Sequence, residues 1–237
     1  MIRTALLIAL SFVLYSGAVF SERSIPYPGS RPDEITKQDT TDIQLLLNGK
    51  VWRNLYGNIK SDPYLFSASF AKGTITANGK TWHNRDVRYD IYNDELETTG
   101  ARGIIVQLNK EMVSAFSMNY GNGIYRFVRL DRDSLNNIEG YVNALYQGAV
   151  SLYVRYSKKI QVLAVNHEYD IFEQSYKIFL MKDGKMYQVR NKRDVITLFG
   201  NYEAEIKNYI RSKKMRVTKS VPRSFIPLVE FCDKLGQ

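Results

Sequence analysis

The segment YKIFLMKDGKMYQV, residues 176–189, contains the pattern that decides the fold. Residues 176–181 and 185–189 contain aromatic and β-branched side chains, which are typical of strands. Between them, Lys182-Asp183-Gly184 is a tight-turn signal, because an Asp-Gly pair accommodates the positive φ angles of a two-residue hairpin turn. The segment therefore predicts two antiparallel strands joined by a short turn.

Upstream of this hairpin, residues 42–156 show similar short strand patterns separated by turn signals. Asn48-Gly49 and Asn78-Gly79 are typical of hairpin turns in which both central residues adopt positive φ. Long segments with a helical period do not separate the strand patterns, so a parallel α/β sheet is not expected. Alternation of side-chain types predicts strands at residues 64–70, 87–92, 104–108 and 152–156.

After Asn191 the apolar period changes from that of a strand to that of a helix. Residues 192–199 predict a short helix that ends at Gly200, and a second helix follows from Tyr202. Ser224 is a candidate N-cap for a third helix. We therefore expect an α+β fold, in which a mainly antiparallel, hairpin-rich sheet is followed by three short C-terminal helices. The side chains expected to face the core from the last two helices are Tyr202, Ile206, Tyr209, Ile210, Phe225, Leu228, Phe231, Cys232 and Leu235.

The first residues form a separate segment. Arg3 precedes an apolar run at residues 5–14, and the small residues Ser16 and Ala18 follow, which is the pattern of a cleaved signal peptide. A transmembrane anchor is the alternative, but the run is shorter than the roughly 20 apolar residues that a spanning helix requires. The predicted organisation is a signal peptide at 1–21, an extended N-terminal arm at 22–40, an antiparallel β domain at 41–190 and a basic helical tail packed on the sheet at 191–237.

A leader of this kind predicts an exported protein. The periplasm is the expected compartment, with the cell surface and the extracellular space as alternatives, and no transmembrane span is expected after leader cleavage. The chain contains one cysteine, Cys232, so no internal disulfide can form. Its apolar surroundings in the sequence predict a buried structural thiol.

Positive charge is concentrated near the C-terminus. The chain has 33 Lys and Arg against 24 Asp and Glu, and twelve of the basic but only four of the acidic residues lie between Lys182 and Arg223. A local basic surface attracts anionic partners. In an exported protein we expect a lipid, a lipopolysaccharide or an acidic protein rather than nucleic acid; simple solvation of the helices is the alternative. The candidate anion-binding residues are Lys192, Arg193, Arg211, Lys213, Lys214 and Arg216.

The sequence predicts no catalytic residue, no cofactor and no metal site. It lacks a nucleophile elbow, a glycine loop for phosphate and a paired-histidine zinc motif. The two histidines, His83 and His167, are isolated from each other in the sequence. We expect each of them to be structural or exposed, although either could serve as an acid–base group.

Two clusters of acidic residues are weak candidates for a calcium or acid–base site. Asp90, Asp94 and Glu95 could bind calcium or act in acid–base chemistry, but Asn93-Asp94 is also a hairpin-turn pattern. Residues 131–139 resemble a calcium loop only in part, because Leu135 stands where an oxygen ligand is required and no glycine follows it. A turn and a polar loop are the expected structures.

Several segments carry a resemblance to a known family: residues 48–56, 78–81, 87–96, 107–111, 183–185, 191–194 and 213–214. Together they are similar to a family of uncharacterised exported proteins common in Bacteroidota, over most of residues 42–235. The resemblance implies a signal peptide and a cell-envelope setting, and it assigns no site residue. In pattern only, the hairpin-rich region is also similar to the open half-barrels of bacterial lipoprotein carriers.

Three functions remain open from the sequence. The first is a non-enzymatic cell-envelope protein that binds or assembles a partner. The second is a periplasmic carrier of a lipid or lipoprotein, which requires an apolar cavity between the sheet and the helices. The third is a hydrolase, which requires at least two of Asp90, Asp94 and His83 to meet in one cleft.

Overall fold

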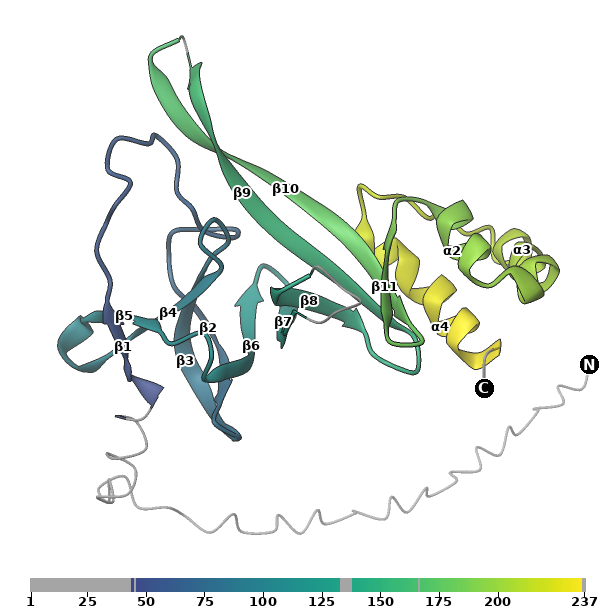
Figure 1. The fold of residues 1–237 in the computed structure, drawn as a ribbon, viewed down its shortest axis with the longest axis horizontal. Coiled ribbons are helices and arrows are strands. Elements are labelled where there is room, and N and C mark those ends of the chain that lie inside the picture. Colours follow the sequence, from purple (N-terminus) through teal and green to yellow (C-terminus); the bar gives the residue numbers. More distant parts are fainter. Residues whose placement is uncertain (1–43, 45, 133–137, 166, 236–237) are drawn as a thin grey trace, which may run out of the picture. The chain divides into compact units, whose positions relative to one another are not determined.

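The computed structural model describes residue 44 and residues 46–132, 138–165 and 167–235. These residues belong to one compact unit, an open antiparallel sheet of eleven strands followed by three C-terminal helices (Figure 1). This confirms the predicted α+β class. The predicted signal peptide and N-terminal arm lie outside the described residues. Within the described ranges, no helix combines the length and the apolar character needed to cross a membrane.

All neighbouring strands of the sheet are antiparallel, in the order β1-β5-β4-β3-β2-β6-β7-β8-β9-β10-β11. After β5 the chain returns to the other side of β2 and continues as a meander from β6 to β11. The strands are β1 (Gly49–Val51), β2 (Ala71–Ala77), β3 (Lys80–Asp90), β4 (Glu95–Thr99), β5 (Ile105–Leu108), β6 (Val113–Tyr120), β7 (Gly123–Leu130), β8 (Gly140–Tyr146), β9 (Ser151–Val165), β10 (Tyr169–Lys182) and β11 (Lys185–Val189).

The helices follow β11 without a long linker and pack against β9, β10 and β11. They are α2 (Lys192–Leu198), α3 (Glu203–Ser212) and α4 (Ile226–Leu235), and the short 3-10 turns are η1 (Ala101–Gly103), η2 (Gly200–Tyr202) and η3 (Pro222–Phe225). Among the side chains predicted to face the core, Ile206, Phe225, Leu228 and Cys232 are fully buried. Burial raises the pKa of the Cys232 thiol to about 12, as expected for a structural cysteine.

The interface between the helices and the sheet is a packed apolar core. Leu152 and Val154 of β9 and Leu180 of β10 have no exposed surface, and they belong to one apolar cluster with buried side chains of all three helices. The carrier hypothesis requires an apolar cavity at this interface, and the dense packing counts against it.

The N-terminal part of the sheet curls around a second core. Tyr89 on β3 and Tyr141 on β8 lie with ring centroids 5.8 Å apart, although β2, β6 and β7 separate these strands in the sheet. Phe116 and Phe127 stack between them at 4.6 Å. Aromatic side chains therefore fill the curled face of this part of the sheet. An open half-barrel that carries an acyl chain would need this concave face to be free.

Two of the three predicted hairpin turns are confirmed. Asn78-Gly79 has φ angles of 49° and 76°, and Asp183-Gly184 has φ angles of 53° and 72°. The third prediction is wrong, because Gly49 begins β1 and pairs with Leu108. Glycine is required there by close approach of the β5 backbone, since a Cβ atom would overlap the carbonyl oxygen of Gln107.

Two further local predictions are wrong. Residues 64–70 form no regular strand, because Phe66 has a φ of 67° and only Tyr64 makes a bridge, to Asp90. The alternation of side-chain types does not correspond to alternating burial here. Tyr64 and Leu65 are neighbours in the chain, and both are buried. Ser224 lies inside η3 and bonds to the backbone of Thr218 instead of capping α4.

Candidate functional site

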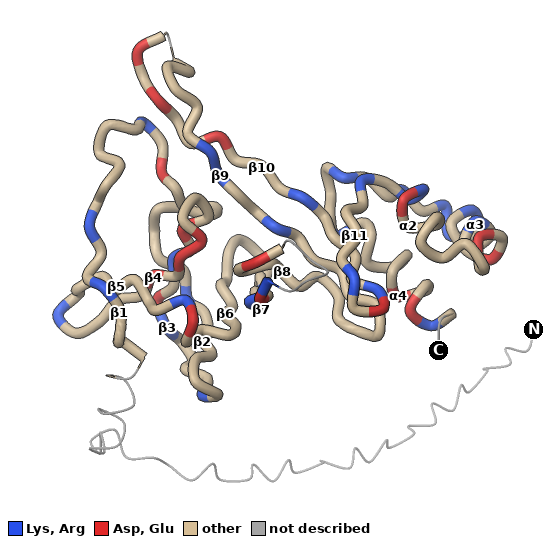
Figure 2. Tube along the Cα trace, in the orientation of Figure 1, with Lys and Arg blue, Asp and Glu red and all other residues tan. Residues whose placement is uncertain are grey.

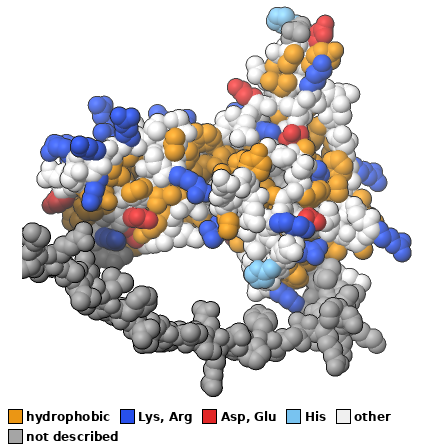
Figure 3. Space-filling model, turned by 180° about the vertical axis from the view of Figure 1, so that it is seen from behind, with side chains coloured by type: hydrophobic (Ala, Val, Ile, Leu, Met, Phe, Trp, Pro, Cys, Tyr) orange, Lys and Arg blue, Asp and Glu red, His pale blue; other side chains and the backbone are white. Residues whose placement is uncertain are grey.

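The basic groove is a surface hollow of about 380 Å³ between α2 and α3. Figure 2 marks the Lys and Arg positions along this helical part of the chain, and Figure 3 shows from behind that Lys and Arg side chains gather over it. Its lining contains five cationic and three apolar side chains and no acidic one. The groove combines a cationic rim with an apolar floor. Its lining residues are Lys192, Arg193, Lys207, Arg211 and Lys214, with Ile196, Ile210 and Met215.

Local sequence signals position both walls of the groove. Asn191 caps α2, and its side chain accepts hydrogen bonds from the backbone of Arg193 and Asp194. At the end of α3, Met215 donates its N–H to the carbonyl of Ile210 at 3.0 Å, and Lys214 adopts a φ of 47°. This is a Schellman ending, and it turns the chain back so that Lys214 and Met215 reach the groove.

Four of the six predicted anion-binding residues meet in the basic groove, whereas Lys213 and Arg216 do not line it. The sequence prediction missed Lys207. Helical spacing could have identified Lys207, because it lies one helical turn before Arg211 and therefore on the same face of α3. Lys207 also pairs with Glu203 across one turn.

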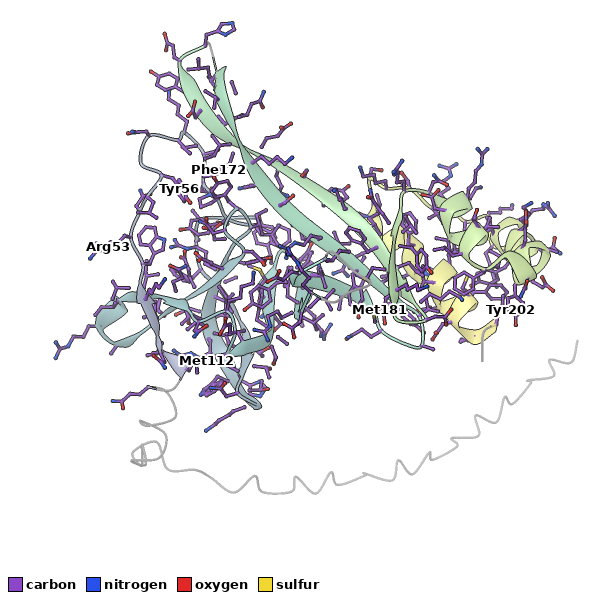
Figure 4. The ribbon with its side chains drawn as sticks, in the orientation of Figure 1. Arg53, Tyr56, Met112, Phe172, Met181 and Tyr202 are labelled. Atoms are coloured by element: carbon purple, nitrogen blue, oxygen red, sulfur yellow. The ribbon has the colours of Figure 1, made fainter. Side chains whose placement is uncertain are left out.

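The acidic cavity is a second hollow, of about 300 Å³, between residues 52–64 and strands β3 and β4. The wall formed by residues 52–64 contacts β10 through aromatic rings. Tyr56 and Phe172 point toward each other in Figure 4, with ring centroids 5.3 Å apart. Acidic side chains outnumber basic ones in its lining. The charged lining residues are Arg53, Asp62, Arg88, Asp90, Glu95 and Glu97, and the large aromatic ones are Trp52, Tyr56 and Tyr64.

Strand pairing places the inner carboxyl groups of the acidic cavity. Glu95 and Glu97 lie two residues apart on β4 and so share one face. Across the pair with β3, Glu97 lies opposite Arg88 and Glu95 lies opposite Asp90. The oxygens of Asp90 accept hydrogen bonds from the backbone of Tyr92 and from the backbone and side chain of Asn93.

A buried ion pair forms the inner end of the acidic cavity. Arg88 donates from Nε at 2.9 Å and from Nη2 at 2.5 Å to Oε2 of Glu97. The rings of Tyr64 and Phe70 lie 4.0 and 4.6 Å from the Arg88 guanidinium carbon. Burial nevertheless raises the pKa of Glu97 to about 7, with a smaller contribution from Asp90, while Arg88 acts in the opposite direction. Burial also raises the pKa of Asp90 and of Glu95.

The raised pKa of Glu97 predicts that the stability of the protein depends on pH. The folded pKa of Glu97 exceeds its ordinary value of 4.5, so the native state binds the proton more tightly than the unfolded state. The contribution of Glu97 should therefore increase the free energy of unfolding as pH falls from about 7 to about 4.5, by about 2 kcal/mol. Glu97→Gln should lack this component in urea unfolding measured across that pH range.

Glu173→Gln is the matched control, because Glu173 is an exposed strand residue outside the acidic cavity. It should retain the wild-type profile. An unchanged pH profile in Glu97→Gln would contradict the assignment.

Asp94 is the centre of a third cluster. It lies in the turn between β3 and β4, as predicted from Asn93-Asp94, with a φ of 61°. Its Oδ1 accepts from Tyr89 Oη at 2.5 Å and Arg155 Nη1 at 3.0 Å, and its Oδ2 accepts from Lys110 Nζ at 2.5 Å. Gly140 packs against it with a φ of 95°, and a Cβ there would overlap Asp94. The cluster joins β3 to β9 across the curled sheet.

The candidate catalytic residues do not meet. Asp90 lines the acidic cavity, whereas Asp94 lines a separate hollow of about 500 Å³. His83 and His167 are exposed, and neither hollow includes them. Residues 133–137 of the predicted polar loop lie outside the described residues. In the described part of the chain, no group of three or more His, Cys, Asp or Glu could hold a metal ion.

Comparisons with protein-family models, with curated proteins and with solved structures find no match. The resemblance to exported envelope proteins therefore stays a prediction. The two features with the chemistry of binding sites are the basic groove and the acidic cavity, and their assignment rests on the residues of this chain.

Proposed function

We propose that this protein is a non-enzymatic binding protein of the cell envelope, and that its basic groove binds a phosphate-bearing amphiphile. The observation that supports this is the lining of the groove, where five cations surround three apolar side chains with no acidic residue. The envelope setting follows from the predicted leader.

The two parts of the groove suit two parts of such a ligand. Arg193 and Arg211 can each present two N–H donors to a phosphate, and the lysines add positive charge. The apolar floor of Ile196, Ile210 and Met215 suits the first methylene groups of an acyl chain. An acidic protein would satisfy the cations but would leave this floor without a partner. We therefore favour the amphiphile.

The groove lies on the surface, so the proposal concerns recognition of a head group and not enclosure of a whole lipid. The packed core behind α4 does not support the carrier alternative. The separation of Asp90 from Asp94 does not support the hydrolase alternative.

Binding to vesicles tests this function. We expect the protein to co-sediment with phosphatidylglycerol vesicles and not with phosphatidylcholine vesicles. The double variant Arg211→Gln/Lys214→Gln should weaken binding at least tenfold, because each cation near an anionic surface contributes about 1 kcal/mol. Short-chain phosphatidic acid should compete better than glycerol phosphate, because only the former can reach the apolar floor.

The chain offers a matched control for charge. Lys213→Gln/Arg216→Gln removes the same two charges from the same segment, outside the groove. It should weaken binding much less. Equal losses in both double variants would show that net charge alone attracts the vesicle. Absence of binding to anionic vesicles would contradict the proposal and leave an acidic protein as the anionic partner.

A further inference from the structure

We propose that the acidic cavity binds an organic amine, with its ammonium group held between Glu95 and Glu97 and its carbon chain packed on the aromatic wall. The inference is independent of the proposed function, because this cavity lies between residues 52–64 and strands β3 and β4 and has the opposite charge to the basic groove.

The first argument is an imbalance of charge between two paired strands. Asp90 and Glu95 lie directly opposite each other on β3 and β4, and like charges at opposed positions destabilise a sheet. Arg88 bonds directly to Glu97. Three lysines act on Glu95 or Asp90, but in the described part of the chain none of them forms an ion pair with either carboxylate: Lys50, Lys110 and Lys158. Glu95 is therefore the carboxylate that an external cation would neutralise, at a position where the fold itself creates repulsion.

The second argument is the bonding of Glu97. Its side chain is only 2% exposed, yet both Arg88 hydrogen bonds end on the same oxygen, Oε2. Neither bond uses Oε1, and Glu97 lines the cavity. An ammonium group brings three donors, so it can bond to Oε1 of Glu97 and to Glu95 together.

The third argument is the aromatic wall of the acidic cavity. Trp52, Tyr56 and Tyr64 line the cavity, and aromatic faces attract cations and pack well on methylene groups. The protein already uses this chemistry at the inner end of the cavity, since the rings of Tyr64 and Trp52 lie 4.0 and 5.1 Å from the Arg88 guanidinium carbon. The volume of about 300 Å³ is at the lower end of small-ligand sites. These features suit a short alkyl amine.

A metal ion is a poorer fit to the same residues. A small cation needs several oxygen ligands converging on one point, and the described residues contain no such group of three or more side chains. The oxygens of Asp90 are already taken by Tyr92 and Asn93. An amine on a carbon chain needs fewer oxygens and gains from the aromatic wall.

Trp52 provides a direct readout. The chain has two tryptophans, so Trp82→Phe leaves Trp52 as the reporter within the cavity. We expect 1,5-diaminopentane and a lysine residue capped at both ends to change Trp52 fluorescence saturably, with sodium chloride at equal ionic strength producing no such change. Tighter binding of the diamine would identify a free amine as the ligand, and tighter binding of capped lysine a peptide side chain.

Matched variants decide whether the signal comes from the cavity. Glu95→Gln should weaken amine binding at least tenfold, which is about 1.4 kcal/mol, whereas Glu173→Gln should not change it. If Glu95→Gln does not fold, Trp52→Leu followed by calorimetry replaces it and should also weaken binding. The proposal is overturned if no saturable binding occurs below about 10 mM, if sodium reproduces the signal, or if Glu95→Gln and Glu173→Gln bind equally.

Discussion

Asp94→Asn is expected to lower the free energy of unfolding by about 3 kcal/mol. The substitution removes the negative charge that Arg155 and Lys110 share, and it leaves both cations close together without a counter-charge. The side chains of these cations are 24% and 34% exposed, so solvent screens part of the effect. The expected loss is therefore at the low end for a broken buried pair.

The choice of asparagine separates charge from backbone strain. Asp94 has a φ of 61°, a conformation that asparagine tolerates as well as aspartate does. Asp183→Asn is the matched control, since Asp183 lies in the turn between β10 and β11 with a φ of 53° and its ion pair with Lys182 is exposed. Its effect should stay within about 0.5 kcal/mol.

Urea unfolding of both variants at neutral pH measures the difference. A similar small effect in both would show that the Asp94 cluster contributes no more than a surface pair. A large effect confined to Asp94→Asn would support its role in holding β3 against β9.

Leu228→Ala should also lower the free energy of unfolding by about 3 kcal/mol. Leu228 lies on α4 with no exposed surface, between the helix and the apolar side chains of β9 and β10. Shortening it leaves a cavity in a region where backbone elements on both sides limit collapse. The change thus tests whether the helical tail is part of the same folding unit as the sheet.

The expected unfolding of Leu228→Ala is a single transition with the wild-type slope against urea. Leu55→Ala is the control, because Leu55 is 76% exposed and should have an effect of about 0.5 kcal/mol or less. Two separate transitions in Leu228→Ala, with only the first one shifted, would show that the tail unfolds independently and would contradict a shared core.

Local patterns predicted most of the secondary structure. The hairpins at Asn78-Gly79 and Asp183-Gly184 and all three C-terminal helices occur where turn residues and periodicity placed them. The prediction failed at Gly49, where the same Asn-Gly pair begins a strand because β5 approaches closely. It also failed at residues 64–70, where Phe66 adopts a positive φ and the consecutive residues Tyr64 and Leu65 are both buried.

The candidate sites were less accessible from the sequence. The basic groove was found in part, since charge density and helical spacing are local properties and four predicted residues line it. The acidic cavity was not found, because its wall comes from residues 52–64 and its carboxyl groups from β3 and β4. Asp94 was correctly placed in a turn, but its partners Lys110 and Arg155 are distant in the chain.

By itself, the sequence determined the α+β class, the antiparallel connections and the basic C-terminal helices, because turn chemistry, periodicity and charge act over a few residues. Only the tertiary structure decided which charges meet. The curl of the sheet brings Asp94 to Arg155, and the register of β3 with β4 sets Asp90 against Glu95. Such contacts depend on long-range strand pairing and burial, which no short window of sequence contains.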